Sequence, residues 1–270
     1  MRRKQRLTIT LPKDMLDQID GLVDYKETKN RSHAIEQLIR TSLVPTVSEA
    51  VILGGGGKMG SLPALKKFKG VTLVETMVSH MSSHNIKKVW VAMGKNNGQV
   101  EALLKNGSKY NLSLSYVDEP NPLGTGGVIK SLSKFINKPF LVIHGDVLTN
   151  INLTECIKFH QEEGTLVTMA VKPRSWEKSF GKVLLEGNKI TKFVGKTDEA
   201  GVNMVNTGVY VMEPEIFSFI NNSPASLEKD VFSKLAEKGE LTAYLFQGVW
   251  FDISSQKNYK LALKRWRSHG

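Results

Sequence analysis

The chain has 270 residues, 40% of them hydrophobic, so it can bury a sizeable core, and one domain of about 220 residues plus a short appendage fits best. Its net charge of +11 favours polyanionic partners such as nucleic acid, nucleotides or phosphorylated sugars, and composition does not choose among them. No segment approaches the roughly 18 apolar residues of a membrane span, so we expect a cytoplasmic protein without a membrane partner. The single cysteine, Cys156, excludes an internal disulfide and is expected to pack in a helix.

The first forty residues predict a strand and two helices. Residues 6–11 alternate polar and apolar side chains with period two, which is typical of a short strand. Helical spacing of apolar residues follows from Pro12 to Tyr25, and again to about Ser42 in a second helix that Asn30 or Ser32 would cap. The polar face of the strand would present Arg6, Thr8 and Thr10.

So small a unit has too little core to be stable alone, so we expect a homodimer. The pattern over residues 4–43 resembles the ribbon-helix-helix family of DNA-binding dimers. The resemblance implies an intertwined dimer whose two-stranded ribbon enters the major groove of duplex DNA, with base edges facing Arg6, Thr8 and Thr10. A guanidinium and two hydroxyls suit such contacts. The alternative is a dimerisation module whose polar strand face is only solvated. Residues 1–44 are assigned to this module and residues 45–49 to a linker.

From Ala50 onward, strands and helices alternate. An apolar strand at 50–53 runs directly into four glycines, and strands expected at 89–93, 112–117 and 140–143 are separated by helices. Such alternation predicts an α/β domain over residues 50–270, with a Rossmann-like, mostly parallel sheet covered on both faces. Ligands bind these sheets at the carboxyl ends of the strands, where the glycines and Gly145-Asp146 would lie.

Beyond residue 171 the pattern changes to shorter strands, which indicates a substrate-side lobe. Strands are expected at 182–186, 189–193 and 208–211, and helices at 214–220 and 226–238. A final strand ends at Asp252 and an amphipathic helix follows it.

Four separated motifs point to one chemistry. They are the stretches 54–60 (GGGGKMG), 119–127 (EPNPLGTGG), 144–147 (HGDV) and 250–253 (WFDI). Their order and spacing resemble the sugar-1-phosphate nucleotidylyltransferases, which have a GT-A-like fold, and the SLEKD sequence at 226–230 is similar to the mannose- and heptose-1-phosphate guanylyltransferase branch. The resemblance implies transfer of a nucleoside monophosphate from a nucleoside triphosphate, with GTP favoured, to a sugar-1-phosphate with release of pyrophosphate.

The resemblance also implies roles for individual residues. Asp146 and Asp252 match the two carboxylates that bind Mg²⁺, which the chemistry needs because negative charge on the α-phosphate must be offset. His144 stands where the family more often has Asn, and we interpret it as a positioning or packed residue. The nucleotide would contact Leu53, Gly54, Gly55, Gly56, Gly57, Gly124, Thr125 and Gly126. The sugar phosphate would contact Gly145, Lys196 and Asn206.

The first loop departs from the family pattern of Gly-x-Gly-Thr-Arg followed by Pro-Lys. Aligned with molybdopterin-type nucleotidyltransferases, Lys58 takes the place of the arginine and would counter the triphosphate charge as a catalytic residue, while Lys66 or Lys67 would substitute for the later lysine. Because a lysine lacks the bidentate fork of arginine, we expect slower departure of pyrophosphate. Gly195 replaces the glutamate that normally precedes Lys196 in the family, so the identity of the sugar stays open.

Two other functions stay open at this point. The altered loop, together with the N-terminal module, is also consistent with a DNA-binding transcriptional regulator whose degenerate transferase domain senses a nucleotide or nucleotide sugar. A nucleotidyltransferase that acts on another phosphorylated acceptor, such as a cofactor precursor, is the other alternative.

Overall fold

The structure is a computed structural model, and it divides the chain into two compact units, residues 1–45 and 46–270. Among the residues that it describes, no helix is both long and apolar enough to cross a bilayer. The described residues are 8–26, 28–43, 47–54, 62–175, 182–194, 202–221 and 223–266.

The smaller unit contains the two expected helices, α1 (Lys13–Asp20) and α2 (Arg31–Leu43). The Asn30 side chain caps α2, because its Oδ1 accepts a hydrogen bond from the His33 amide at 2.9 Å. The first helix ends at Asp20 rather than at Tyr25, whose φ of 59° is incompatible with a right-handed helix.

The expected strand at 6–11 is not observed in its described part. Residues 8–11, which include Thr8 and Thr10, have no regular secondary structure, and Arg6 lies outside the described residues. A single strand has no partner for its backbone hydrogen bonds within one chain, so the segment forms no ladder here.

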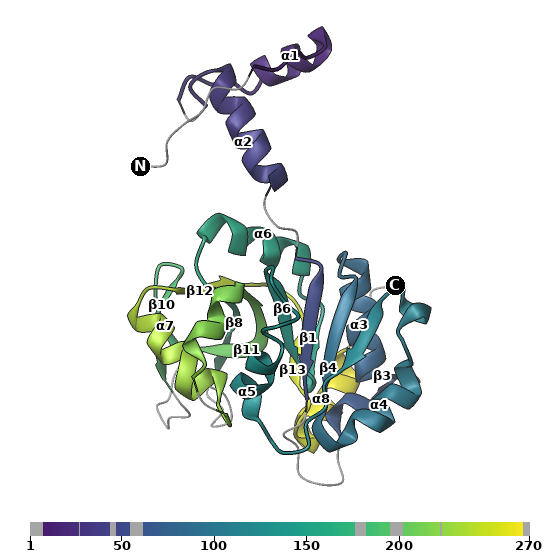
Figure 1. Cartoon of the computed structure of the whole chain (residues 1–270). Coiled ribbons are helices and arrows are strands. Elements are labelled where there is room, and N and C mark those ends of the chain that lie inside the picture. The colour runs from purple at the N-terminus through teal and green to yellow at the C-terminus, as the bar shows by residue number, and fades with distance from the viewer. Residues whose placement is uncertain are drawn as a thin grey trace. The chain divides into compact units, whose positions relative to one another are not determined.

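The larger unit is built on a sheet whose described strands number nine, in the order β5-β4-β1-β6-β11-β8-β12-β10-β9 (Figure 1). Four neighbouring strands on one side are parallel, and β1 lies between β4 and β6 in register along its whole length. These four are β1 (Glu49–Leu53), β4 (Lys88–Ala92), β5 (Ser113–Tyr116) and β6 (Phe140–His144).

The other side of the sheet is mixed, which corrects the expectation of a mostly parallel sheet for this half. Strand β11 runs antiparallel to both β6 and β8, whereas β8 and β12 are parallel. Strands β9 and β10 form a hairpin through Gly187, whose φ is +61°, and so short a connection permits only antiparallel pairing. The strands are β8 (Val167–Ser175), β9 (Lys182–Glu186), β10 (Lys189–Val194), β11 (Val202–Met212) and β12 (Leu241–Leu245).

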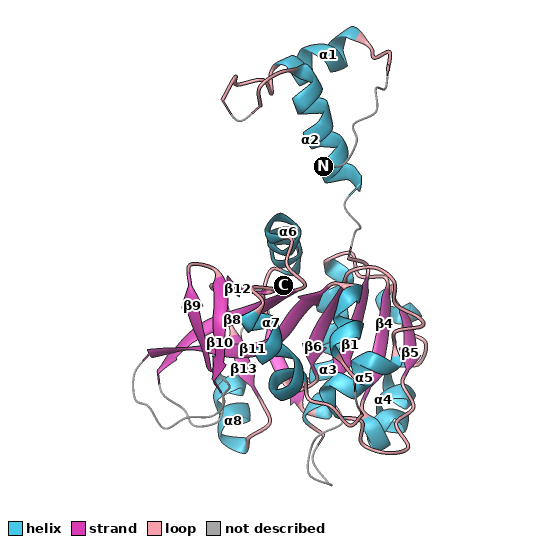
Figure 2. Cartoon of the chain, turned by 60° about the vertical axis from the view of Figure 1, so that its left-hand side comes forward, coloured by secondary structure: helices cyan, strands magenta, loops and turns pink. Residues whose placement is uncertain are grey.

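Helices cover both faces of this sheet, as expected (Figure 2). Alternate residues of β1 enter two separate cores: Ala50 and Ile52 face one, and Val51 and Leu53 face the other. The first core is covered by α3 (Leu73–Ser83), α4 (Asn97–Leu104), α6 (Leu153–Glu163) and α8 (Gln256–Arg265). The second is covered by α5 (Gly124–Ser131), the 3-10 helix η4 (Pro214–Phe219), the π-helical turn η5 (Leu227–Phe232) and α7 (Ser233–Glu237).

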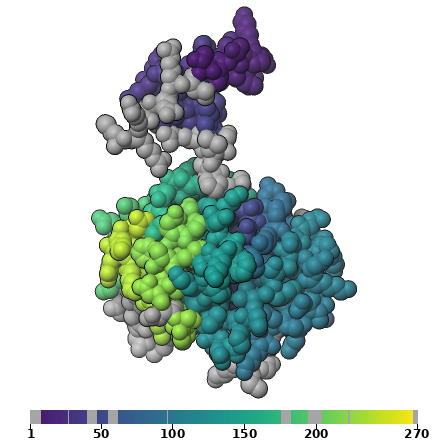
Figure 3. Space-filling view, in the orientation of Figure 1, coloured from purple at the N-terminus to yellow at the C-terminus, as the bar shows by residue number. Residues whose placement is uncertain are grey.

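Two short ladders lie outside the main sheet. Strand β7 (Val147–Thr149) pairs antiparallel with β13 (Trp250–Asp252), and β2 (Lys67–Phe68) pairs with β3 (Val71–Thr72). On the face shown in the space-filling view, blue and teal segments of this unit occupy one side and green and yellow segments the other, whereas the late helix α8 packs against the early strand β2 (Figure 3). The β7–β13 ladder joins a segment near the middle of the sequence to one about 100 residues later.

Candidate active site

Two glycines lie side by side where β1 and β6 end. Leu53 stands opposite His144 in the ladder, and the Gly145 amide donates to the Leu53 carbonyl at 2.7 Å. A Cβ atom on Gly145 would lie 3.1 Å from the Gly54 Cα, and one on Gly54 would lie 2.2 Å from the Met93 Sδ, so a side chain at either position would require its neighbours to shift. This is the carboxyl edge of the parallel strands, where such sheets bind ligands.

The rest of the predicted nucleotide loop, Gly55, Gly56, Gly57 and Lys58, lies outside the described residues, as does Lys196. Their assigned roles stay predictions.

The two predicted metal-binding carboxylates are brought together by the β7–β13 ladder. Asp252 stands opposite Val147 in that ladder, and the Ile253 amide donates to the Asp146 carbonyl at 2.9 Å. Both side chains are partly buried, and one Asp252 carboxylate oxygen also accepts from the Ser254 amide at 2.8 Å. Two carboxylates from distant parts of the sequence therefore share one site.

A lysine lies next to this pair. Lys66 follows the short 3-10 helix η1 (Pro63–Leu65), and its Nζ donates to the Ile253 carbonyl at 2.8 Å and lies 5.0 Å from the centre of the Tyr259 ring. Burial lowers the pKa of Lys66, although Asp252 and Asp146 both act to raise it. Of the two lysines that could replace the family's later lysine, the structure places Lys66 at the carboxylates, whereas Lys67 is exposed on β2.

The electrostatics of the pair fit a divalent cation. Burial raises the pKa of Asp146, and Asp252 raises it further, while His144 and Lys66 lower it. Two acidic groups in a partly buried place are mutually unfavourable without positive charge. Within the described part of the chain, no cluster of three or more His, Cys, Asp or Glu side chains could hold a metal. The protein would therefore offer two oxygen ligands, a number that suits Mg²⁺ because this ion keeps several waters.

The glycine-threonine segment at the start of α5 is fixed to the chain around Ala225. Gly124 has a φ of +72°, and a Cβ there would lie 2.3 Å from the Ala225 carbonyl oxygen. The Gly126 amide donates to that same oxygen at 2.8 Å. Thr125 Oγ1 accepts from the Leu227 amide at 2.9 Å, so the predicted nucleotide-contacting segment is held on both sides.

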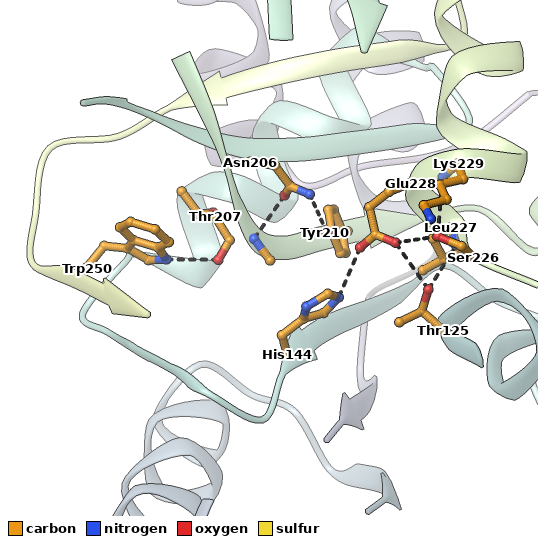
Figure 4. Close-up of polar contacts among 11 residues, drawn as sticks. Thr125, His144, Asn206, Thr207, Tyr210, Ser226, Leu227, Glu228, Lys229 and Trp250 are labelled. Atoms are coloured by element: carbon orange, nitrogen blue, oxygen red, sulfur yellow. Dashed lines mark hydrogen bonds and ion pairs between the residues drawn. The ribbon is translucent and has the colours of Figure 1, made fainter. Parts of the chain in front are cut away.

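The side chain of the predicted sugar-contacting residue Asn206 bonds within its own strand, β11. Its amide oxygen accepts from the Gly208 amide at 2.9 Å, and its Nδ2 donates to the Tyr210 hydroxyl at 2.8 Å (Figure 4). The next residue is also fixed, because Trp250 Nε1 donates to the Thr207 carbonyl at 2.8 Å. The Trp250–Thr207 bond connects β11 to β13, which carries Asp252.

A residue that the motifs did not single out, Glu228, lies at the centre of a polar network. Its Oε2 accepts from Ser226 Oγ at 2.9 Å and from Thr125 Oγ1 at 3.3 Å, and its Oε1 lies 3.7 Å from His144 Nε2. Figure 4 shows the carboxylate between the threonine and the histidine ring. The signal in the sequence was the SLEKD segment, in which Ser226 begins a helical turn and accepts from the Lys229 amide.

A family comparison decides the class of this site. The nucleotidyl transferase family matches residues 58–266, which is most of the larger unit. The chain belongs to this family.

Sequence relatives within the family are mannose-1-phosphate guanyltransferases. The protein of that name from Aspergillus oryzae is 31% identical over 166 residues, covering 59% of this chain and 46% of its own. The catalytic subunit beta of the Danio rerio mannose-1-phosphate guanylyltransferase is 32% identical over 153 residues, covering 55% and 42%. The chain thus spans only about half the length of these relatives.

Solved structures show the same fold. HddC from Yersinia pseudotuberculosis, in a complex with GMP-PN, matches with a TM-score of 0.71 and 19% identity, covering 82% of this chain and all of its own. A putative glucose-1-phosphate thymidylyltransferase from Bacillus anthracis matches with a TM-score of 0.74 and 17% identity, covering 83% and 97%. At these identities the likeness establishes the α/β nucleotidyltransferase fold.

Proposed function

We propose that the larger unit is a Mg²⁺-dependent nucleotidylyltransferase that transfers a nucleoside monophosphate from a nucleoside triphosphate to a sugar-1-phosphate and releases pyrophosphate. The observation that carries the proposal is the meeting of Asp146 and Asp252 beside Lys66, at the glycine edge of the sheet. GTP is favoured as the donor, because the sequence relatives are named guanyltransferases and HddC has been crystallised with GMP-PN.

The chain's own groups suit this reaction. Asp146 and Asp252 would hold Mg²⁺, which when bound would offset the negative charge of the triphosphate. Gly54 and Gly145 pack against each other where β1 and β6 end, at the carboxyl edge where such sheets bind ligands. Lys66 supplies a positive charge beside the carboxylates, and Lys58 and Lys196 are proposed to hold the triphosphate and the sugar phosphate.

Pyrophosphate release tests the proposal. The full chain would be incubated with each of the four common nucleoside triphosphates, with Mg²⁺, and with mannose-, glucose- or heptose-1-phosphate. Release that requires both substrates, and that EDTA abolishes, is the expected result. Release without any sugar phosphate, or with none of the combinations, would contradict it.

We further propose that the smaller unit forms a homodimer of the ribbon-helix-helix type and binds duplex DNA through Arg6, Thr8 and Thr10. The supporting observation is that this unit exposes several large apolar side chains, which a second copy would cover. Six of them are each between 42% and 83% exposed: Ile9, Met15, Leu22, Tyr25, Leu38 and Ile39.

Association and DNA binding are measured separately. Sedimentation of the full chain is expected to give a dimer, and Leu38→Glu is expected to give a monomer. Binding of mixed-sequence duplex DNA is expected to weaken steeply with salt, and Thr8→Ala with Thr10→Ala to reduce sequence preference without changing the dimer. A wild-type monomer would contradict the dimer.

The alternative of a regulator that senses a nucleotide is judged by the same experiments. Tight nucleotide binding without pyrophosphate release, combined with salt-sensitive DNA binding, would favour it. Turnover on the order of 1 per second would exclude a purely sensing role.

A further inference from the structure

We propose that His144 and Glu228 together bind one hydroxyl group of the sugar ring, and so help to select the sugar-1-phosphate. The inference rests on the proposed transferase function and adds a specificity determinant to it. It comes from the His144 Nε2 atom, which has no hydrogen-bond partner among the described residues, and from the Glu228 Oε1 atom, which lies 3.7 Å from it.

His144 ends β6 next to the substrate-side strand β11. A Cβ on Gly208 of β11 would lie only 3.1 Å from the His144 Cβ and Cγ, so the glycine makes room for the ring. The ring also packs edge-on against Tyr210, with 5.6 Å between ring centres. These contacts fix the ring and leave Nε2 pointing toward Glu228 (Figure 4).

The Nε2 atom is buried and has no hydrogen-bond partner among the described residues. A buried polar nitrogen without a hydrogen-bond partner is costly, so such an atom beside a proposed substrate site indicates a ligand that completes it. The His144 side chain as a whole is 23% exposed and that of Glu228 is 25% exposed, so the pair lies near the protein surface although the Nε2 atom itself is covered.

Glu228 has one oxygen in use and one available to a ligand. The hydroxyls of Ser226 and Thr125 donate to Oε2, which fixes the carboxylate, whereas Oε1 faces His144 Nε2 at 3.7 Å. That separation is longer than a direct N–H···O bond of about 2.7–3.2 Å. An oxygen placed beside both atoms can lie at normal hydrogen-bond distance from each.

Only a group that both donates and accepts satisfies this arrangement. The imidazole N–H requires an acceptor and the carboxylate requires a donor, and a hydroxyl supplies both from one small atom. A phosphate or carbonyl oxygen cannot donate, and a phosphate would also be repelled by Glu228. Because the pair adjoins β11 of the substrate-side half, we assign the hydroxyl to the sugar ring rather than to the ribose of the nucleotide.

Deoxy analogues test the assignment. Pyrophosphate release by the full chain would be measured with the preferred sugar-1-phosphate and with its 2-, 3-, 4- and 6-deoxy forms. A hydrogen bond to a charged group predicts that loss of one particular hydroxyl raises the KM of the wild type by about 10- to 100-fold. In Glu228→Gln and His144→Phe, the KM for the parent sugar-1-phosphate should rise. The KM of each variant for that deoxy form should then equal its KM for the parent sugar-1-phosphate.

Three measurements keep the result specific. The KM for the nucleoside triphosphate should stay within about twofold in both variants, which also shows that they are folded. His144→Asn retains an N–H donor, so it should recover part of the preference for the parent sugar-1-phosphate over the deoxy form that His144→Phe loses. Glu162→Gln, at an exposed carboxylate on α6, is the matched control and should behave as the wild type.

Several outcomes overturn the inference. Equal penalties for all deoxy sugars in the wild type and in Glu228→Gln would show that the pair does not bind a hydroxyl. A penalty that follows 2′- or 3′-deoxynucleotides instead would assign the hydroxyl to the ribose and refute the sugar assignment. Absence of pyrophosphate release with every sugar phosphate would be a different result, since it would refute the transferase function itself.

Discussion

Asp146 and Asp252 are joined through the backbone, because the Ile253 amide donates to the Asp146 carbonyl at 2.9 Å while Asp252 completes the β7–β13 ladder. The relative position of the two carboxylates therefore depends on main-chain hydrogen bonds rather than on surface loops. Substitutions of either side chain can remove its charge without removing the ladder.

Asp252→Asn should reduce kcat for pyrophosphate release on the order of 100-fold, because a preorganised charge at the reacting phosphates is lost while the side-chain shape is kept. The amide oxygen can still accept from the Ser254 amide, so thermal stability should change little. Glu186→Gln, at an exposed carboxylate at the end of β9, is the control and should leave kcat unchanged. A kcat for Asp252→Asn within twofold of the wild type would contradict the proposed site.

Lys66→Met and Lys67→Met form a matched pair of adjacent substitutions. Lys66 donates to the Ile253 carbonyl and interacts electrostatically with both carboxylates, so Lys66→Met should lower kcat/KM by about 10- to 100-fold, the range for loss of one charged group at the site. Lys67→Met should have little effect. Steady-state kinetics at several triphosphate concentrations measure both, and equal effects would show that Lys66 acts only through the net charge of the surface.

Gly124→Ala and Gly187→Ala separate two costs of replacing a glycine. Both positions have positive φ, +72° and +61°, but a Cβ meets the Ala225 carbonyl oxygen at 2.3 Å only at Gly124. Gly187→Ala should therefore lower the free energy of unfolding by about 1 kcal/mol, and Gly124→Ala should lower it further and raise the KM for the triphosphate. Denaturant unfolding and kinetics check this, and equal losses of stability would contradict the close packing.

Stability should fall in mild acid because of two histidines, His80 on α3 and His84 at its C-terminal cap. Burial lowers the pKa of His80, whose Nε2 donates to the Ile151 carbonyl at 2.8 Å, and burial also lowers the pKa of His84. The folded state then binds fewer protons than the unfolded state, so the stabilisation is complete above the ordinary value of 6.5 and is lost as the pH falls below it. The variant with His80→Gln and His84→Gln should lose less free energy of unfolding between pH 7.5 and 5.5, and an unchanged loss would contradict this origin.

Much of the fold follows from residue patterns, and the exceptions have physical reasons. Alternation and helical spacing predicted β1, β4 and β6, and burial of Cys156 in α6 is confirmed. No strand was predicted at β12, where Thr242 is polar in the sequence but fully buried, since its hydroxyl bonds to those of Thr165 and Thr168. A pattern that treats threonine as polar does not detect a strand whose polar groups satisfy one another inside.

In the candidate site too, the sequence indicated some residues and only the tertiary structure showed the others. Asp146 follows a wholly apolar strand, which marks it in the sequence, whereas the approach of Lys66 depends on a carbonyl in a distant segment. Glu228 lies in a helical start that capping alone explains, and only its distance from His144 gives it a further role. Pairwise meetings of this kind arise from tertiary packing, which local patterns do not encode.

The β7–β13 ladder also sets the order in which the protein becomes competent during synthesis. β1, β6 and β7 are translated well before β13, so a nascent chain can assemble the glycine edge and Asp146 while Asp252 is still absent. On the proposed function, triphosphate bound by such an incomplete chain would lack the second carboxylate that positions the metal. The site is therefore complete only after β13 has been synthesised and has docked on β7, and on the proposed function chains that lack β13 would not consume nucleotide.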